Sequence, residues 1–375
     1  MKTHIVVLGA GFGGLECCTL LSETLGDSVQ VTLIDKSDHF VFGFSKLDVM
    51  FGHAEWDAVK LPYRKFVKPG VTLVTAKITA IDPVTRRITT EAGSFDADYL
   101  VVALGADYDI AGTPGLAEAN EFYSVRGTEA LRKKLPDLRK GRALIGGCGA
   151  PYKCPPAPSE CALMLHDYLT ERGVRDQCQI DFVLPLSSPV PPSPETSKAL
   201  LAAFAERNIT FTPGRRVASI DNARGVAVLD DGSERSFDIF FGVPRHHVPS
   251  VVQDSGLAEG GWISVNPRTL ETKFPNVWAV GDGANTGTPK AGLFAEGAAK
   301  AAASAIINRI YGGEVTPYNG FGVCYLEFGG GRIGKVEVDF FSGPAPTGTY
   351  HEPSVELRAG KEEFGASRRA RWFGM

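Results

Sequence analysis

The segment His4-Ile5-Val6-Val7-Leu8-Gly9-Ala10-Gly11-Phe12-Gly13-Gly14 determines the fold of this chain. Its first part is short, apolar and β-branched, typical of a buried parallel strand, and the rest reads G-x-G-x-x-G. Gly9 permits a tight turn, Gly11 lets a pyrophosphate approach the backbone, and Gly14 allows a helix to pack closely on the strand. A helical pattern follows, and then a strand at 29–34 leads into Asp35, which can accept hydrogen bonds from a ribose. The segment predicts a dinucleotide-binding domain.

Two later segments favour FAD over NAD as the dinucleotide. Residues 99–106 read YLVVALGA and residues 277–283 read VWAVGDG, each an apolar strand that ends in a turn of small residues. A helix is predicted at 291–307. This three-part pattern resembles the flavoprotein reductases with two dinucleotide-binding domains, in which the acid matching Asp282 holds ribityl or phosphate oxygens of the flavin. The other interpretation of Asp282 is a helix N-cap. The predicted cofactor-binding residues are Gly9, Gly11, Gly14, Asp35, Ala103, Gly105, Gly281, Asp282 and Lys290.

A second nucleotide-binding turn is present but degenerate. Residues 142–151 read RALIGGCGAP and lack the third glycine. Prolines at 151, 155, 156 and 158 remove backbone N–H donors that a phosphate would need. The next predicted strand, at 179–184, is followed by Pro185 and not by an acid that would hold a ribose. NAD(P)H is therefore not the expected reductant.

Chain length and motifs together predict the domain organisation. At about 150 residues per domain, 375 residues correspond to two domains and a further unit. We predict an α/β fold with two Rossmann-like dinucleotide-binding domains of the disulfide-reductase-like kind and a C-terminal α+β unit. The FAD-binding domain is predicted at 1–110 and 245–314, the degenerate nucleotide-binding-like domain at 111–244, and the C-terminal interface or membrane-contact unit at 315–375.

Composition narrows the function classes. The net charge of −4 gives no support to nucleic-acid binding. The N-terminus shows no secretory signal and no segment reaches the length of a membrane span, so a cytoplasmic location is expected. Seven cysteines are too few for a disulfide scaffold, and an odd number leaves at least one without an intrachain partner.

Cys154 differs from the other cysteines. It follows Lys153 and precedes a helix N-terminus, and both features favour the thiolate. Neither a zinc-ligand spacing nor a C-x-x-C pair is present, so no metal is predicted and a redox partner must be remote in sequence. Cys324 is the candidate, with two unrelated thiols as the alternative. The remaining cysteines are interpreted as packing residues: Cys17, Cys18, Cys148, Cys161 and Cys178.

The segment 153–158, KCPPAP, resembles the K/R-C-x-x-A/G-P segment of sulfide:quinone oxidoreductases and of the flavoprotein subunit of flavocytochrome c sulfide dehydrogenases. Residues 288–292 (TPKAG) are similar to the P-K-x-G of that family, and residues 244–249 (PRHHVP) to its P-x-H-x-x-P. The resemblance implies a redox disulfide between Cys154 and Cys324 and a Lys290 that lies near the flavin. Residues 36–60 contain no cysteine, so FAD is predicted to be non-covalent.

The resemblance implies that hydrosulfide opens the disulfide, leaving a persulfide on Cys324 and a thiolate on Cys154, and that two electrons pass through the flavin to a quinone. His246 or His247 can move protons, since histidine titrates near neutrality; ordinary loop histidines are the alternative. A persulfide or a small thiol remains open as the substrate. The rival functions are an NADH:quinone reductase, a flavoprotein subunit bound to a c-type cytochrome, and a non-enzymatic flavin-binding sensor or scaffold.

The last residues predict how the chain contacts its surroundings. Residues 364–375 contain three arginines, no acid and the aromatic residues Phe364, Trp372 and Phe373. Basic and aromatic residues together are typical of a membrane surface, so peripheral contact with the cytoplasmic face of a membrane is expected. A disordered soluble tail is the alternative, and a homodimer is also open.

Overall fold

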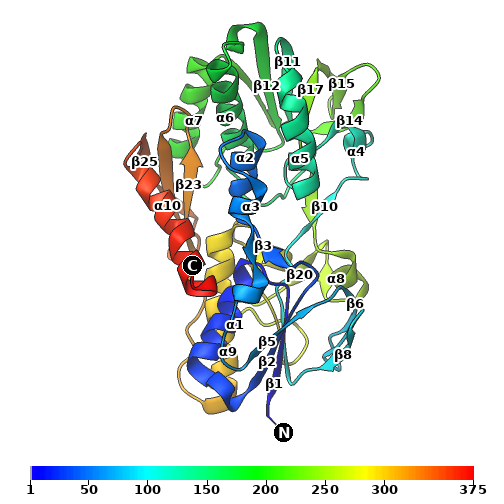
Figure 1. The fold of residues 1–375 in the computed structure, drawn as a ribbon, viewed down its shortest axis with the longest axis vertical. Helices are drawn as coiled ribbons and strands as arrows, with labels where there is room; N and C mark the ends of the chain where they lie inside the picture. The colour runs from blue at the N-terminus through cyan, green and yellow to red at the C-terminus, as the bar shows by residue number, and fades with distance from the viewer. Residues whose placement is uncertain (1) are drawn as a thin grey trace.

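A five-stranded parallel sheet forms the core of the lower half of the molecule in Figure 1, which shows a computed structural model describing residues 2–375. Its strands, in sheet order, are β21 (Val277–Ala279), β9 (Tyr99–Val102), β1 (His4–Leu8), β2 (Gln30–Asp35) and β5 (Val71–Thr75). The strand that precedes the glycine turn, β1, is therefore the central strand of the sheet. Parallel strands place all their carboxyl ends at one edge of the sheet, and the predicted cofactor residues lie in the turns directly after these ends.

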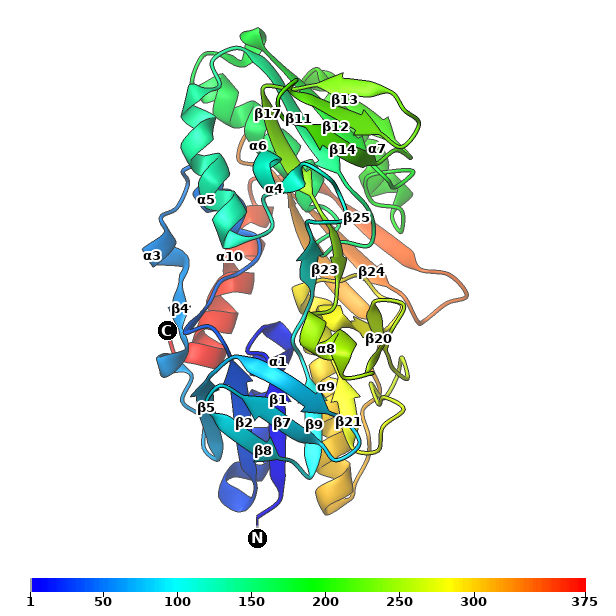
Figure 2. The ribbon, with the colours of Figure 1, turned by 90° about the vertical axis from the view of Figure 1, so that its right-hand side faces the viewer.

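Both faces of this sheet are covered, because the side chains of β1 alternate between two apolar clusters. Ile5 and Val7 belong to the cluster that includes the apolar sides of α1 (Phe12–Leu25) and α9 (Gly292–Tyr311). Val6 and Leu8 pack in the opposite cluster, against an antiparallel sheet of β6 (Ile78–Asp82), β7 (Arg87–Thr90) and β8 (Gly93–Asp96). Figure 2 shows β7 and β8 overlying the parallel strands on that side.

The upper half is built on a second parallel sheet of four strands. In sheet order they are β13 (Ile209–Pro213), β12 (Cys178–Leu184), β11 (Gly141–Gly147) and β17 (Ile239–Val243). One face packs on α5 (Val125–Lys134), α6 (Ala157–Glu171) and α7 (Pro194–Glu206), and the other on the antiparallel strands β14 (Val217–Asp221), β15 (Val226–Leu229) and β16 (Glu234–Ser236). An antiparallel pair, β10 (Asp107–Asp109) and β18 (Arg245–His247), connects the two halves.

The C-terminal part adds a third layer. Its antiparallel strands β23 (Phe321–Glu327), β24 (Ile333–Asp339) and β25 (Thr347–Ser354) are followed by α10 (Leu357–Arg368) and a π-helical turn at Arg369–Phe373. These elements form the α+β unit that the sequence predicted at the C-terminus. The remaining α-helices and β-strands are short: α2 (Ser45–Met50), α3 (Trp56–Val59), α4 (Leu116–Ala119), α8 (Ser250–Asp254), β3 (His39–Phe40), β4 (Leu61–Pro62), β19 (Ala258–Glu259), β20 (Trp262–Ser264) and β22 (Ala284–Asn285).

The predicted α/β class with two parallel-sheet units and a C-terminal α+β unit is confirmed. The predicted domain boundaries stay a prediction. Between residues 2 and 375, no helix combines the length and the apolar composition that crossing a bilayer requires.

The C-terminal aromatic residues do not face outward as the membrane-contact prediction assumed. Trp372 and Phe373 are 1% and 4% exposed and pack in the main apolar cluster. Arg371 pairs with Glu16 and Glu23 of α1. The alternative of a disordered tail is also wrong, because α10 and the π-helical turn occupy this segment. Trp372 and Phe373 therefore close the protein's own core instead of facing a membrane.

Candidate active site

The glycine turn between β1 and α1 forms one end of a cavity of about 620 Å³. Gly9 has a φ of +95°, and a Cβ added there would lie 2.5 Å from the carbonyl oxygen of Ala103. A Cβ at Gly14 would lie 1.8 Å from the carbonyl oxygen of Gly9, so only glycine permits this packing. A Cβ at Gly11 would meet no atom within 4 Å. The open space beside Gly11 is what a bound pyrophosphate requires.

Asp35 stands beside this turn at the end of β2. One of its carboxylate oxygens accepts the N–H of Ala10 at 2.7 Å and the other accepts the N–H of Ser37 at 2.8 Å. The hydroxyl of Tyr63 donates to the carbonyl oxygen of Ala10 at 2.7 Å. Asp35 also lines the cavity, so its carboxylate both holds the turn and is presented to a ligand.

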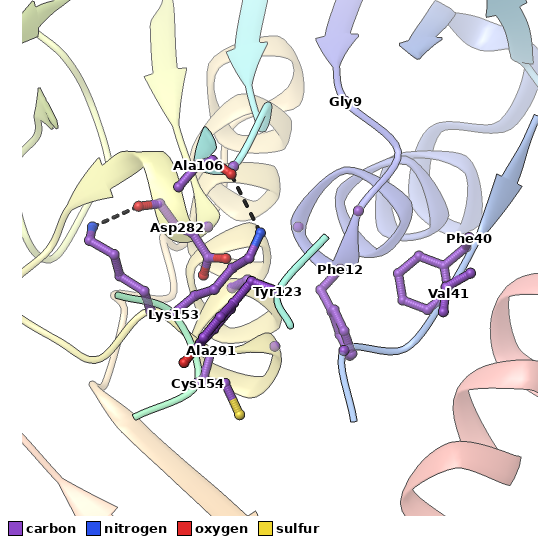
Figure 3. A pocket seen from close by; sticks show the side chains of 18 of the residues that line it. Gly9, Phe12, Phe40, Val41, Ala106, Tyr123, Lys153, Cys154, Asp282 and Ala291 are labelled. Carbon is purple, nitrogen blue, oxygen red and sulfur yellow. Dashed lines mark hydrogen bonds between the residues drawn. The ribbon is translucent and has the colours of Figure 1, made fainter. Parts of the chain in front are cut away.

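The other predicted cofactor residues line the same cavity, although they come from distant parts of the sequence. Figure 3 shows Asp282 and Ala106 on one side and Phe12 and Phe40 on the other. Gly14 is the one member of the predicted set that lies behind the turn instead of on the cavity wall. The members that line it are Gly9, Gly11, Asp35, Ala103, Gly105, Gly281, Asp282 and Lys290.

Cys154 and Cys324 line this cavity as well. Cys154 lies in the loop before α6 with a φ of +53°, and its carbonyl oxygen accepts the N–H of Ala157 at 2.9 Å. Cys324 comes from β23. Both side chains are present as free thiols. The proximity of Cys324 is one of the causes that raise the pKa of Cys154.

The expected activation of Cys154 by Lys153 is wrong. Burial, with Glu160 and Cys324 nearby, raises the pKa of Cys154 well above that of an ordinary thiol. Lys153 points away, because its Nζ donates to the carbonyl oxygen of Ala106 at 3.4 Å (Figure 3). The same Nζ lies 4.7 Å from the ring centroid of Tyr108. The sequence places Lys153 next to Cys154 but does not show that the two side chains diverge.

Lys290 lies at the cavity as the resemblance implied. Its Nζ donates to the carbonyl oxygen of Asp282 at 2.6 Å and sits 3.4 Å from the ring centroid of Trp262. Burial lowers the pKa of Lys290 to about 8. Lys290 is therefore a half-buried residue of the cavity wall and not a solvated surface lysine.

The structure does not bring His246 and His247 to the cavity wall. His246 is 1% exposed, its Nδ1 bonds the carbonyl oxygen of Pro244 at 2.8 Å, and the rings of Tyr108 and Tyr123 each lie 4.9 Å from it. Burial, assisted by Lys153, lowers the pKa of His246 to about 3. His247 bonds the carbonyl oxygen of Val248 at 2.6 Å. His246 is thus a neutral packing residue near neutral pH, which does not suit a proton carrier.

The charged residues on the cavity wall that sequence reasoning missed include Lys46, Glu160 and Lys361. Glu160 is 3% exposed, and burial raises its pKa to about 7. Burial, with Lys153 nearby, lowers the pKa of Lys46 to about 7, and its Nζ donates to the carbonyl oxygen of Tyr123. A signal for Glu160 was present, because it is a lone acid in the apolar helical run 157–165. Lys46 and Lys361 carried no comparable signal.

In the degenerate nucleotide-binding turn after β11, other parts of the chain fill the space beside the glycines. A Cβ added at Gly147 would lie 2.6 Å from Cδ of Pro185, and one at Gly149 would lie 2.9 Å from Cβ of Arg245. A pyrophosphate therefore has no open backbone to approach at these two glycines, whereas it has open space beside Gly11.

Residues 3–302 match the family described as pyridine nucleotide-disulphide oxidoreductase. The chain is 26% identical over 369 residues to the mitochondrial sulfide:quinone oxidoreductase of Mus musculus. The aligned region covers 92% of this chain and 80% of that protein. It is 27% identical over 338 residues to the sulfide-quinone reductase of Aquifex aeolicus, and this alignment covers 83% of this chain and 77% of that protein. A type II NADH:quinone oxidoreductase of Staphylococcus saprophyticus is 34% identical over 139 residues, only 36% of this chain and 35% of that protein.

The solved structure of the sulfide:quinone oxidoreductase from Aquifex aeolicus has the same fold, with a TM-score of 0.87 and 24% identity over 99% of this chain and 92% of that one. The resemblance stated from the cysteine segment is thus confirmed as a similarity over most of the chain. Because the family match spans residues 3–302 of 375, this chain belongs to the pyridine nucleotide-disulphide oxidoreductase family.

Proposed function

We propose that this chain is an FAD-dependent oxidoreductase that oxidises sulfide, or a related small sulfur species, and passes two electrons to a quinone. The observation that carries the proposal is that Cys154 and Cys324 line the same cavity as Gly11, Asp282 and Lys290. The similarity to sulfide:quinone oxidoreductases over 92% and 83% of the chain supports it.

The residues of the cavity fit a non-covalently bound FAD. Gly11 leaves open backbone for the pyrophosphate, Asp35 is positioned for the ribose, and Asp282 and Lys290 line the far end. When bound, FAD supplies a two-electron acceptor that the side chains lack. The absence of cysteine from residues 36–60 supports attachment without a covalent bond.

The cysteine pair performs the sulfur chemistry in this proposal. Hydrosulfide attacks Sγ of Cys324 in a Cys154–Cys324 disulfide; a new S–S bond forms, the original one breaks, and Cys154 leaves as a thiolate. Burial raises the pKa of both free thiols, that of Cys324 to about 12. The thiolate therefore comes from opening the bridge and not from ionisation of a free thiol. Lys46 favours the charge on Cys154.

An apolar wall supports quinone as the electron acceptor. Phe44, Leu47, Val323 and Phe364 line the same cavity as Cys324 and Lys361. A quinone ring needs a flat apolar contact for its body and polar groups for its oxygens. Because membrane quinones are apolar and stay in the bilayer, we include contact with a membrane surface in the proposal. The buried residues Trp372 and Phe373 do not make this contact. The cytoplasmic location and the homodimer stay predictions.

The partial match to a type II NADH:quinone oxidoreductase keeps NADH as the rival reductant. The prolines after the second glycine turn and the contact of Pro185 with Gly147 oppose it. Rapid anaerobic mixing of the flavin-loaded protein with sulfide, in the wild type and in Cys154→Ser, tests the proposal. Sulfide should reduce the flavin of the wild type and not that of the variant; equal reduction of both would exclude the disulfide mechanism.

A further inference from the structure

The C-terminal segment lies across the two helices that begin at the cofactor cavity. Residues 357–373, which form α10 and the π-helical turn, are called the C-terminal strap below. The strap runs down from the upper half, and its last turns meet α1 and α9 close to their first residues (Figure 1). Phe12 and Gly13 of α1 and Gly292 and Leu293 of α9 line the cavity. The strap therefore contacts the two helices on which the cofactor site is built.

Two ion pairs attach the strap, one to each helix. The guanidinium of Arg371 donates to both carboxylate oxygens of Glu16 in α1, at 2.8 Å and 3.0 Å. The guanidinium of Arg368 donates to both oxygens of Glu296 in α9, each at 2.9 Å. Glu16 and Glu296 are only 2% and 4% exposed. Bidentate pairs of this kind are directional, so they fix the strap relative to the start of both helices.

Aromatic contacts connect the strap with the phosphate-binding turn. The ring of Phe12 lies 5.5 Å from the ring of Trp372 and 6.2 Å from that of Phe364. The same ring packs on the start of α9, because a Cβ added at Gly292 would lie 2.7 Å from it. Phe12 directly follows Gly11, beside which the pyrophosphate is expected. The strap and α9 thus hold the residue that begins the phosphate-binding helix.

The strap also neutralises a charge behind the phosphate site. Glu16 lies four residues after Phe12, which is about 6 Å along the axis of α1. An unpaired carboxylate at this distance would repel a bound pyrophosphate, and burial would keep water from screening it. Arg371 removes this repulsion only while the strap is docked. Loosening the strap therefore releases Phe12 and exposes the phosphate site to the charge of Glu16.

We propose that Arg368 and Arg371 are positioning residues of the cofactor site, through which the C-terminal strap slows the release of FAD. Neither arginine lines the cavity, so they act through Glu296 and Glu16. Coupling between two binding events is reciprocal, so bound FAD must stabilise the docked strap as much as the strap stabilises bound FAD. The inference rests on the proposed function in one respect, namely that FAD occupies the cavity without a covalent bond.

The double variant Arg368→Ala/Arg371→Ala tests the proposal through the rate at which FAD leaves. The holoprotein is diluted rapidly, and release is followed by the rise in flavin fluorescence. We expect release to be at least about tenfold faster than in the wild type. Arg369→Ala is the matched control, because Arg369 lies in the same turn but is not the partner of Glu16 or Glu296. It should release FAD at the wild-type rate.

A second control separates the strap from a general loss of stability. Phe204→Leu removes packing against Phe182 in the upper half, where the ring centroids lie 5.7 Å apart. This variant should also release FAD at the wild-type rate. Wild-type release in the double variant, or equally fast release in Phe204→Leu, would overturn the proposal.

Hydrogen exchange of the wild type tests the reciprocal effect without any substitution. Mass spectrometry compares the apoprotein with the holoprotein in peptides that cover residues 364–373. FAD should slow the exchange of their backbone amides, and equal exchange in the two forms would overturn the coupling. Sulfide and quinone are absent from both experiments, so a failure of sulfide to reduce the flavin would count against the proposed function alone.

Discussion

The backbone N–H of Cys154 donates a 2.7 Å hydrogen bond to the carbonyl oxygen of Lys290. This bond joins the loop before α6 in the upper half to the loop before α9 in the lower half. Cys154 has a left-handed backbone, with a φ of +53°, a conformation that costs a non-glycine residue about 1 kcal/mol or more. The link to Lys290 therefore fixes the cysteine relative to the lysine at the cofactor cavity.

Replacing either cysteine should abolish the reaction with sulfide. In Cys154→Ser and Cys324→Ser, the rate of flavin reduction by sulfide should fall by more than about 100-fold, because the two sulfurs act as one unit. Cys178→Ser is the control, since Cys178 is buried in β12 and does not line the cavity. Stopped-flow absorbance of the flavin provides the rates. Sulfide-driven reduction at the wild-type rate in both active-site variants would contradict the role of the pair.

Two glycines of the same turn should respond differently to alanine. In Gly11→Ala the added Cβ meets no atom of the protein within 4 Å, so the unfolding free energy of the apoprotein should stay unchanged. FAD affinity should fall by about tenfold or more, equivalent to at least about 1.4 kcal/mol. In Gly14→Ala the Cβ would lie 1.8 Å from the carbonyl oxygen of Gly9, and overpacking should cost about 1–3 kcal/mol of stability.

Urea unfolding of the apoproteins and fluorescence titration with FAD measure these effects. If Gly11→Ala bound FAD with wild-type affinity, the open space beside Gly11 would not be the pyrophosphate site. If Gly14→Ala were as stable as the wild type, the tight contact with Gly9 would be wrong.

His246 should make the protein sensitive to acid. Burial lowers the pKa of His246 to about 3, while a histidine in the unfolded chain takes up a proton near pH 6.5. The unfolded state therefore binds more protons between these values, and stability is lost as pH falls from about 6.5 to 3. His246→Phe keeps the aromatic packing between Tyr108 and Tyr123 and removes the titration. Its unfolding free energy should depend less steeply on pH in this window; an unchanged slope would contradict the assignment.

The C-terminal turn should contribute to stability through a buried carboxylate. Arg371 contacts Glu16 at 2.8 Å and 3.0 Å, and Nε1 of Trp372 donates to Glu16 at 2.9 Å. The Glu16 side chain is 3% exposed, whereas that of Arg371 is 36% exposed. Arg371→Ala leaves the charge of Glu16 buried with one partner fewer, and should cost about 2 kcal/mol after allowance for solvent screening of the arginine. Arg369→Ala, in the same turn, is the control in urea unfolding, and an equal loss in both would contradict a specific role for Arg371.

The sequence alone was sufficient to predict the site residues that directly follow a parallel strand. Asp35, Gly105 and Asp282 stand after parallel strands, and one local pattern of strand and turn identifies each of them. Parallel strands bring these turns to one sheet edge, so their meeting in one cavity needs no knowledge of side-chain packing. The resemblance in the segment around Cys154 then supplied Cys324, which no local pattern links to it.

The other parts depend on tertiary packing that neighbours in sequence do not show. Lys153 follows the backbone next to Cys154, yet its side chain turns toward Ala106 and Tyr108. Trp372 lies in a basic and aromatic stretch whose composition is the same whether it meets a membrane or the acids of α1. Lys361 pairs with Glu327 of β23 and lies over the ring of Phe44, two residues that are far from it in the sequence.

The most direct measurement is an anaerobic titration of the oxidised, FAD-loaded protein, once with sulfide and once with NADH, followed through the visible absorption of the flavin. The account predicts that sulfide bleaches this absorption at stoichiometric amounts and that NADH leaves it unchanged over the same time. Bleaching by NADH with no response to sulfide would contradict the central claim.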